Sequence, residues 1–74
     1  MNKERRNKIQ HIIDSINSIR DKLQGVLDDE QFALDSMPEN LQYSMRGEES
    51  QEAIDYMNEA IEYLDNAIET LESI

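Results

Sequence analysis

The sequence is 74 residues long, contains no cysteine, and carries seven Lys and Arg against 17 Asp and Glu, for a formal net charge of -10. A chain of this length forms one domain at most, whose small core often needs support from oligomerisation. The lack of cysteine excludes disulfides, thiol catalysis and thiolate metal sites. No apolar run approaches the roughly 18 residues of a membrane span, and no signal-peptide core follows the basic start, so we expect a cytoplasmic protein.

The charge is unevenly distributed along the chain. Residues 1–22 hold six bases against three acids, a net charge of +3, whereas residues 23–74 hold only Arg46 against fourteen acids, a net charge of -13. The simplest interpretation is that the two halves lie antiparallel and that their opposite charges set the register.

A first long helix is predicted over about residues 3–36. Its apolar residues alternate at spacings of three and four, which predicts one seam along the helix: Ile9, Ile12, Ile16, Ile19, Leu23 and Val26. The same spacing continues through Glu30 and Ala33 to Met37. Ile13, Leu27 and Leu34 lie next to this seam and widen it toward the broader face of a helical bundle. Glu30 occupies a seam position where an apolar residue is expected, and we expect its side chain to reach toward solvent near the turn rather than to be buried in a pair.

Residues 37–47 form the predicted turn, because Pro38 disfavours helical geometry in the residue before it. The segment Ser36-Met37-Pro38-Glu39 matches a capping box and predicts one short helical turn over residues 38–42. Met37 and Leu41 are expected to cover the end of the core at the turn. Tyr43, Met45 and Arg46 are better candidates for contact with a partner protein, since such side chains are enriched at interfaces.

A second helix over about residues 48–73 contains three consecutive seven-residue units that begin at Ala53, Ala60 and Ala67. A heptad seam runs along it, flanked by these alanines: Ile54, Met57, Ile61, Leu64, Ile68 and Leu71. Tyr56 and Tyr63, seven residues apart, mark a second, partly apolar line.

Two heptad helices joined by a short turn predict an all-α fold, with residues 1–74 forming one antiparallel two-helix coiled-coil hairpin. The alanines allow close approach of another backbone. Together with Phe32, Ile13 and Leu27, the line of Tyr56 and Tyr63 presents more apolar surface than one two-helix contact covers. We therefore predict a homo-oligomer, most simply two hairpins in a four-helix bundle.

The sequence contains no catalytic signature, and we expect no enzyme activity, metal or cofactor. His11 is the only histidine and has no partner histidine or cysteine with which to hold zinc. Asp28-Asp29-Glu30 lacks the alternating ligands and the glycine of a calcium loop. The many carboxylates of the second helix are expected to form a solvated face, although such a face also resembles a phosphate backbone in charge.

The basic N-terminal segment is an alternative functional site. If two copies meet there, Arg5, Arg6, Lys8 and His11 form a cluster that could hold a phosphate-bearing ligand, either a nucleotide or RNA. The high negative charge of the whole chain opposes long-range attraction of a polyanion. A solvated end that sets the helix register is the simpler interpretation.

The turn and the residues after it also resemble small acidic proteins encoded by bacteriophages and prophages, over a region that starts at Asp28-Asp29-Glu30-Gln31. The resemblance is carried by Met37-Pro38-Glu39-Asn40-Leu41-Gln42, Ser44, Arg46-Gly47-Glu48 and the heptads from Glu52. Ser36 and Met45 depart from the pattern, which commonly has Asn before Met-Pro and Glu before Arg-Gly. The resemblance implies a phage setting in an infected or lysogenic host and a helical hairpin, but no established activity.

The leading hypothesis is therefore a non-enzymatic, phage-type protein-interaction module that binds a host or phage protein, such as a defence or nucleic-acid-processing factor that it inhibits. A nucleotide or RNA binder at the basic ends is the first alternative. A structural assembly factor is the second.

Overall fold

The computed structural model describes residues 1–74 and is all-helical, with 88% of the chain in helices and no strands. The expected all-α class is confirmed. The helices are α1 (Lys3–Asp35), α2 (Glu39–Gln42) and α3 (Met45–Glu72). The described molecule is a rod with principal extents of 58 × 15 × 12 Å.

The helix ends follow ordinary capping rules. Asn2 precedes α1, and its side-chain oxygen accepts a hydrogen bond from the backbone N–H of Arg5 at 2.8 Å. Ser44 precedes α3, and its hydroxyl accepts from the N–H of Gly47 at 3.5 Å. Each interaction satisfies one of the backbone donors that the first turn of a helix leaves free.

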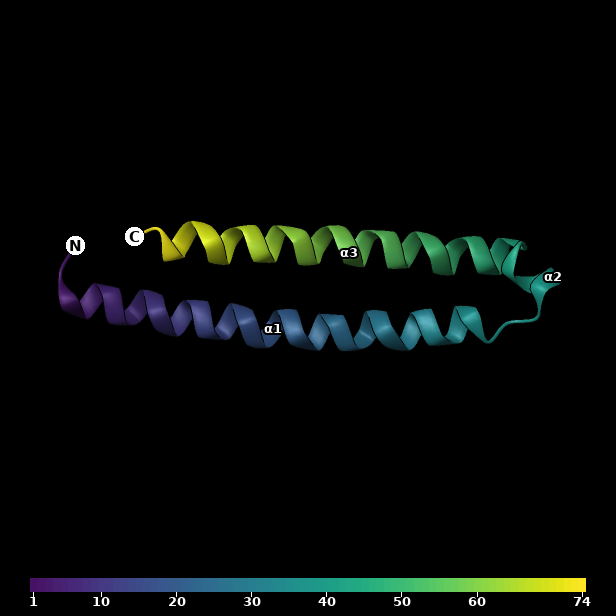
Figure 1. Ribbon diagram of the computed structural model, residues 1–74, viewed down its shortest axis with the longest axis horizontal. Coiled ribbons are helices and arrows are strands. Elements are labelled where there is room, and N and C mark those ends of the chain that lie inside the picture. The colour runs from purple at the N-terminus through teal and green to yellow at the C-terminus, as the bar shows by residue number, and fades with distance from the viewer.

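In the structure α3 runs back along α1, so that both termini lie at one end of the rod and α2 lies at the other (Figure 1). We call these the open end and the turn end. Two contacts between α1 and α3 define the register: the guanidinium of Arg20 donates to the carboxylate of Asp65 at 2.8 Å, and the hydroxyl of Ser50 donates to Glu30 at 2.7 Å. In this register residue 23 is level with residue 61.

The core is a single line of side chains between the two helices. Ile54, 2% exposed, forms its most buried point and belongs to a cluster with Leu27, Leu34 and Ile61. Ile13 and Ile68 are the other buried apolar residues. Burial of one such side chain contributes about 1.5–3 kcal/mol, so a core this narrow supports only a modest stability.

The seam predicted for the first helix is partly wrong. Ile12, Ile19 and Val26 are 50%, 55% and 56% exposed. The residues that face α3 instead repeat at spacings of four and three: Ile9, Ile13, Ile16, Arg20, Leu23, Leu27, Glu30, Leu34 and Met37. Positions 9, 16, 23, 30 and 37 belong to both seams, so the sequence of one helix left two choices for the residues between them.

The turn also differs from the prediction in three respects. Ser36 ends α1 as its C-cap, whereas the N-cap of α2 is Pro38 and makes no side-chain hydrogen bond, so the predicted capping box is wrong. The second long helix begins at Met45, three residues before the predicted start at residue 48. Met37 packs against the core cluster as expected, but Leu41 remains 40% exposed.

Candidate protein-interaction surfaces

The turn end is held together by close approach of α2 to α3. A Cβ atom on Gly47 would lie 2.1 Å from the backbone carbonyl oxygen of Gln42, a separation that real Cβ atoms do not reach. The side-chain amide of Gln42 in turn donates to the carbonyl of Met37 at 3.0 Å. Glycine at position 47 therefore lets the α2 backbone pack directly on the first turn of α3 and fixes the side chains around it.

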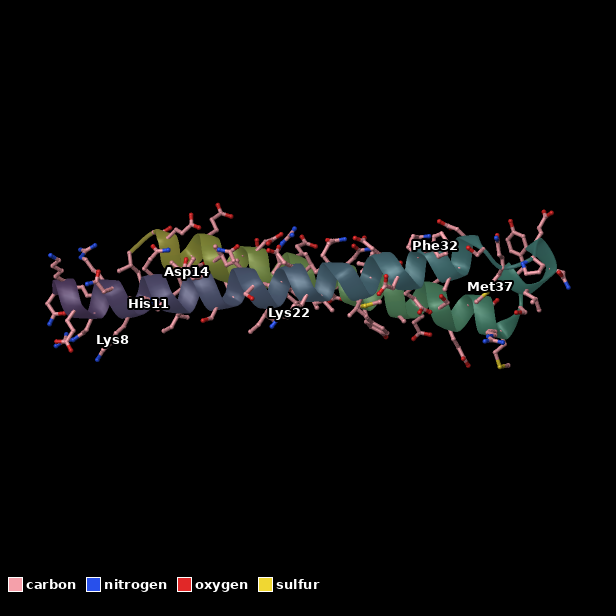
Figure 2. The ribbon with its side chains drawn as sticks, turned by 90° about the horizontal axis from the view of Figure 1, so that it is seen from below. Lys8, His11, Asp14, Lys22, Phe32 and Met37 are labelled. Atoms are coloured by element: carbon pink, nitrogen blue, oxygen red, sulfur yellow. The ribbon has the colours of Figure 1, made fainter.

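Three large apolar side chains stand exposed at this end. Tyr43, Met45 and Phe32 are 78%, 75% and 74% exposed, which makes them the most exposed large hydrophobic residues of the chain. Figure 2 shows Phe32 near the turn end of α1, with Met37 beside it at the turn. Single exposed apolar residues are common on protein surfaces, and these three are gathered at the turn end of the rod.

The predicted partner-binding residues occupy two sides of the turn. Tyr43 lines a shallow hollow with Gln31, Asp35, Glu48 and Gln51 among its neighbours. Arg46 lines a different hollow, with Ala33, Met37 and Leu41. The structure therefore brings Tyr43 and Arg46 to the same end of the rod but not to a common hollow.

The turn end also carries most of the negative charge. Residues 23–61 contain ten acids and only one base, Arg46, and thus a net charge of -9. The open end combines residues 1–22, at +3, with the four acids of residues 62–74, for a net charge of -1. A partner that meets the turn end therefore encounters apolar side chains in a strongly acidic field.

Two basic residues of the open end, Arg6 and Lys8, already have side-chain contacts within the chain. The guanidinium of Arg6 donates to the backbone carbonyls of Met1 and Ile74, at 3.3 and 3.0 Å. Lys8 lies 3.6 Å from Glu4, one helical turn earlier. Arg5 and His11 are exposed. The hollow at this end holds Arg6 but neither Arg5, Lys8 nor His11, so one hairpin does not gather these four residues into a phosphate site.

The two sides of the rod differ in polarity. Positions that flank the seam on one side, which we call the polar flank, hold only amides and acids: Gln10, Asn17, Gln24 and Gln31 on α1, and Gln51, Asn58, Asp65 and Glu72 on α3. Gln31 and Gln51 line one hollow together, which places these two lines on the same side.

The opposite side carries an apolar flank, made of Ile12, Ile19, Val26 and Ala33 on α1 and Ala53, Ala60 and Ala67 on α3. In an antiparallel pair of heptad helices, the positions that flank the seam on one side face each other, so the two lines are neighbours. Tyr56 and Tyr63, both 64% exposed, border the alanines.

The carboxylates of α3 are exposed, and apart from the contact of Asp65 with Arg20 the contacts that they make are local. The side-chain amide of Gln51 donates to Asp55 at 3.0 Å, and the hydroxyl of Tyr63 donates to Glu59 at 2.9 Å. This hydrogen bond to Glu59 raises the pKa of Tyr63, because loss of the phenol proton would leave two negative charges together. The ion pair with Asp65 likewise raises the pKa of Arg20.

Other classes of site find little support in the arrangement. No group of three or more His, Cys, Asp or Glu side chains is placed to hold a metal ion. No helix is long and apolar enough to cross a membrane. Comparison with protein-family models, curated proteins and solved structures gives no match.

Sequence reasoning missed the apolar flank as a separate surface, because it placed Ile12, Ile19 and Val26 in the core. A signal for it existed. Ile12, Ile19, Val26 and Ala33 repeat at an uninterrupted spacing of seven, as do the alanines of the second helix. When Ile13, Leu27 and Leu34 form the seam, this repeat remains as a second apolar line.

Proposed function

We propose that this chain is a non-enzymatic protein-interaction module of phage type, which acts as a homo-oligomer of antiparallel helical hairpins and binds a host or phage protein through its turn end. The observation that carries the proposal is the placement of Tyr43, Met45 and Phe32, the three most exposed large apolar side chains, at the end that has a net charge of -9. The phage setting rests on the resemblance of the turn residues.

The partner expected for such a surface has an apolar patch rimmed by Lys or Arg. Burial of aromatic and Met side chains supplies most of the affinity at interfaces, whereas complementary charge raises the association rate and excludes acidic proteins. A nucleic-acid-processing host factor has a basic surface of this kind, and a rod covered with carboxylates would compete with its substrate. Inhibition of such a factor is the activity that we infer.

The test is affinity capture from phage-infected bacterial cells with three forms of the protein. The unmodified chain and the double variant Arg5→Ala/Arg6→Ala are expected to retain one common protein. The double variant Tyr43→Ser/Met45→Ser is expected to lose it, while circular dichroism shows an unchanged helix content, since both side chains are exposed.

Nucleotide content is measured on the same purified samples. A nucleotide or RNA that copurifies with the unmodified chain and is lost in Arg5→Ala/Arg6→Ala would contradict the proposal and favour a phosphate-ligand site at Arg5, Arg6, Lys8 and His11. Retention of the captured protein by Tyr43→Ser/Met45→Ser would also contradict it.

A further inference from the structure

We propose that the apolar flank is the surface through which two copies of this chain pair, and that the two hairpins lie end for end, with the turn end of one beside the open end of the other. This inference rests on the proposed homo-oligomer and assigns its interface and orientation. Three independent features of the chain carry it.

The first feature is the difference between the two flanks. Flanking positions of a two-stranded coiled coil are usually charged or polar, as they are throughout the polar flank. On the apolar flank Ile12, Ile19 and Val26 each leave half or more of their surface exposed although they repeat at spacings of seven. A second seam that is regular over the length of the rod fits another helical hairpin better than an irregular partner.

The second feature is the size of the side chains along the flank. The line on α1 runs from large at the open end to small at the turn end, from Ile12 and Ile19 through Val26 to Ala33, whereas the line on α3 holds alanine throughout. Turning the second copy end for end, about a two-fold axis across the rods, places α1 against α1 and α3 against α3. Ile12 then lies opposite the partner's Ala33, and Ile19 opposite the partner's Val26.

Such large-to-small pairing gives layers of equal volume, as close packing requires. A side-by-side pair with both turn ends together would instead gather both copies of Ile12 at the open end and both copies of Ala33 at the turn end. That arrangement crowds one end and leaves a gap at the other.

The third feature is charge. End-for-end pairing sets the turn end, with a net charge of -9, beside an open end of -1, where Lys3, Arg5 and Lys8 lie. The alternative sets two ends of -9 together. Packed helices lie about 8–10 Å apart, close to the screening length at physiological salt, so this repulsion is felt across the interface. Figure 2 shows Lys8 and Lys22 on one edge of α1 and Asp14 on the other.

The surface is tested by sedimentation equilibrium of Ile19→Gln/Val26→Gln, with Phe32→Gln as the matched control. All three residues are more than half exposed in one hairpin, so the substitutions should leave helix content unchanged. Loss of four buried aliphatic side chains per dimer is expected to raise the dissociation constant by on the order of 100-fold or more, and Phe32→Gln to change it about twofold at most.

The orientation is tested by pulsed electron–electron spin resonance on the exposed turn residue Asn40, replaced by Cys and spin-labelled in this cysteine-free chain. End-for-end pairing predicts a separation of the two labels that approaches the 58 Å length of the rod. A separation of about 20 Å, two helix spacings, would overturn the orientation. A dimer unaffected by Ile19→Gln/Val26→Gln would overturn the surface, whereas a chain that is monomeric without any substitution would overturn the homo-oligomer itself.

Discussion

The hydroxyl of Ser50 donates a 2.7 Å hydrogen bond to the carboxylate of Glu30, and this pair joins α3 to α1 within the seam. Ser50 is 6% exposed and Glu30 is half-buried. The expectation that Glu30 reaches away into solvent is therefore wrong. At a seam position where an apolar residue is expected, the chain has a carboxylate that accepts a hydrogen bond from the facing helix.

Removal of one member of this pair should destabilise the hairpin. Ser50→Ala leaves the half-buried carboxylate without this donor and is expected to lower the free energy of unfolding by about 1–3 kcal/mol. The double variant Ser50→Ala/Glu30→Leu restores an apolar seam and should recover most of that loss. Urea unfolding at one fixed protein concentration measures both. A double variant less stable than Ser50→Ala would refute this account of the pair.

The two glycines should respond to alanine in opposite directions. Gly25 lies within α1, where an added Cβ has nothing within 4 Å, so Gly25→Ala should stabilise the helix by about 1 kcal/mol. Gly47→Ala places its Cβ against the backbone of Gln42 and should destabilise the turn end, because a backbone atom cannot move aside cheaply. Thermal unfolding of the two variants provides the comparison, and a similar stabilisation by both would show that α2 does not pack on α3 as described.

Ile54 should be the most sensitive position of the core. It is 2% exposed and contacts side chains of both helices, so Ile54→Ala is expected to cost about 2–5 kcal/mol and to leave much of the chain unfolded at room temperature. Phe32→Ala, at a position 74% exposed, is the control and should change stability by about 0.5 kcal/mol or less. Helix content by circular dichroism distinguishes them.

The hydrogen bond from Tyr63 to Glu59 predicts a pH dependence at the alkaline end. The pKa of Tyr63 is raised in the folded chain, so the folded state holds the phenol proton more tightly than the unfolded state does. The stabilisation is therefore complete below the ordinary pKa of tyrosine, about 10, and disappears as the pH rises through the raised value. Phenolate absorbance measures the titration. Glu59→Gln should lower the pKa of Tyr63 toward its ordinary value, and an unchanged titration would refute the assignment to Glu59.

Much of the fold could be predicted from the sequence because heptad spacing and Pro38 act locally. The long helices begin and end within about three residues of the predicted bounds. The choice between Ile12 and Ile13, or between Val26 and Leu27, could not be made locally. Both choices give a regular seam on one helix, and only the position of α3 decides which residues are covered.

The candidate sites were less predictable for a related reason. Tyr43, Met45 and Arg46 could be chosen by residue type, but their division between two hollows follows from the path of the chain through α2. The contact of Arg6 with the carbonyl of Ile74 depends on how far α1 extends beyond α3. These contacts depend on the register of the two long helices, whereas the charge pattern indicates only that the two halves of the chain lie antiparallel.

The most direct test of the central claim, that hairpins of this chain pair with one another, is the molar mass of the unmodified protein at micromolar concentration. One chain has a mass of 8.7 kDa. Sedimentation equilibrium is predicted to give twice that mass, with a melting temperature that rises with protein concentration, as expected when association and folding are linked. A single species of 8.7 kDa that unfolds cooperatively at a concentration-independent temperature would contradict the claim.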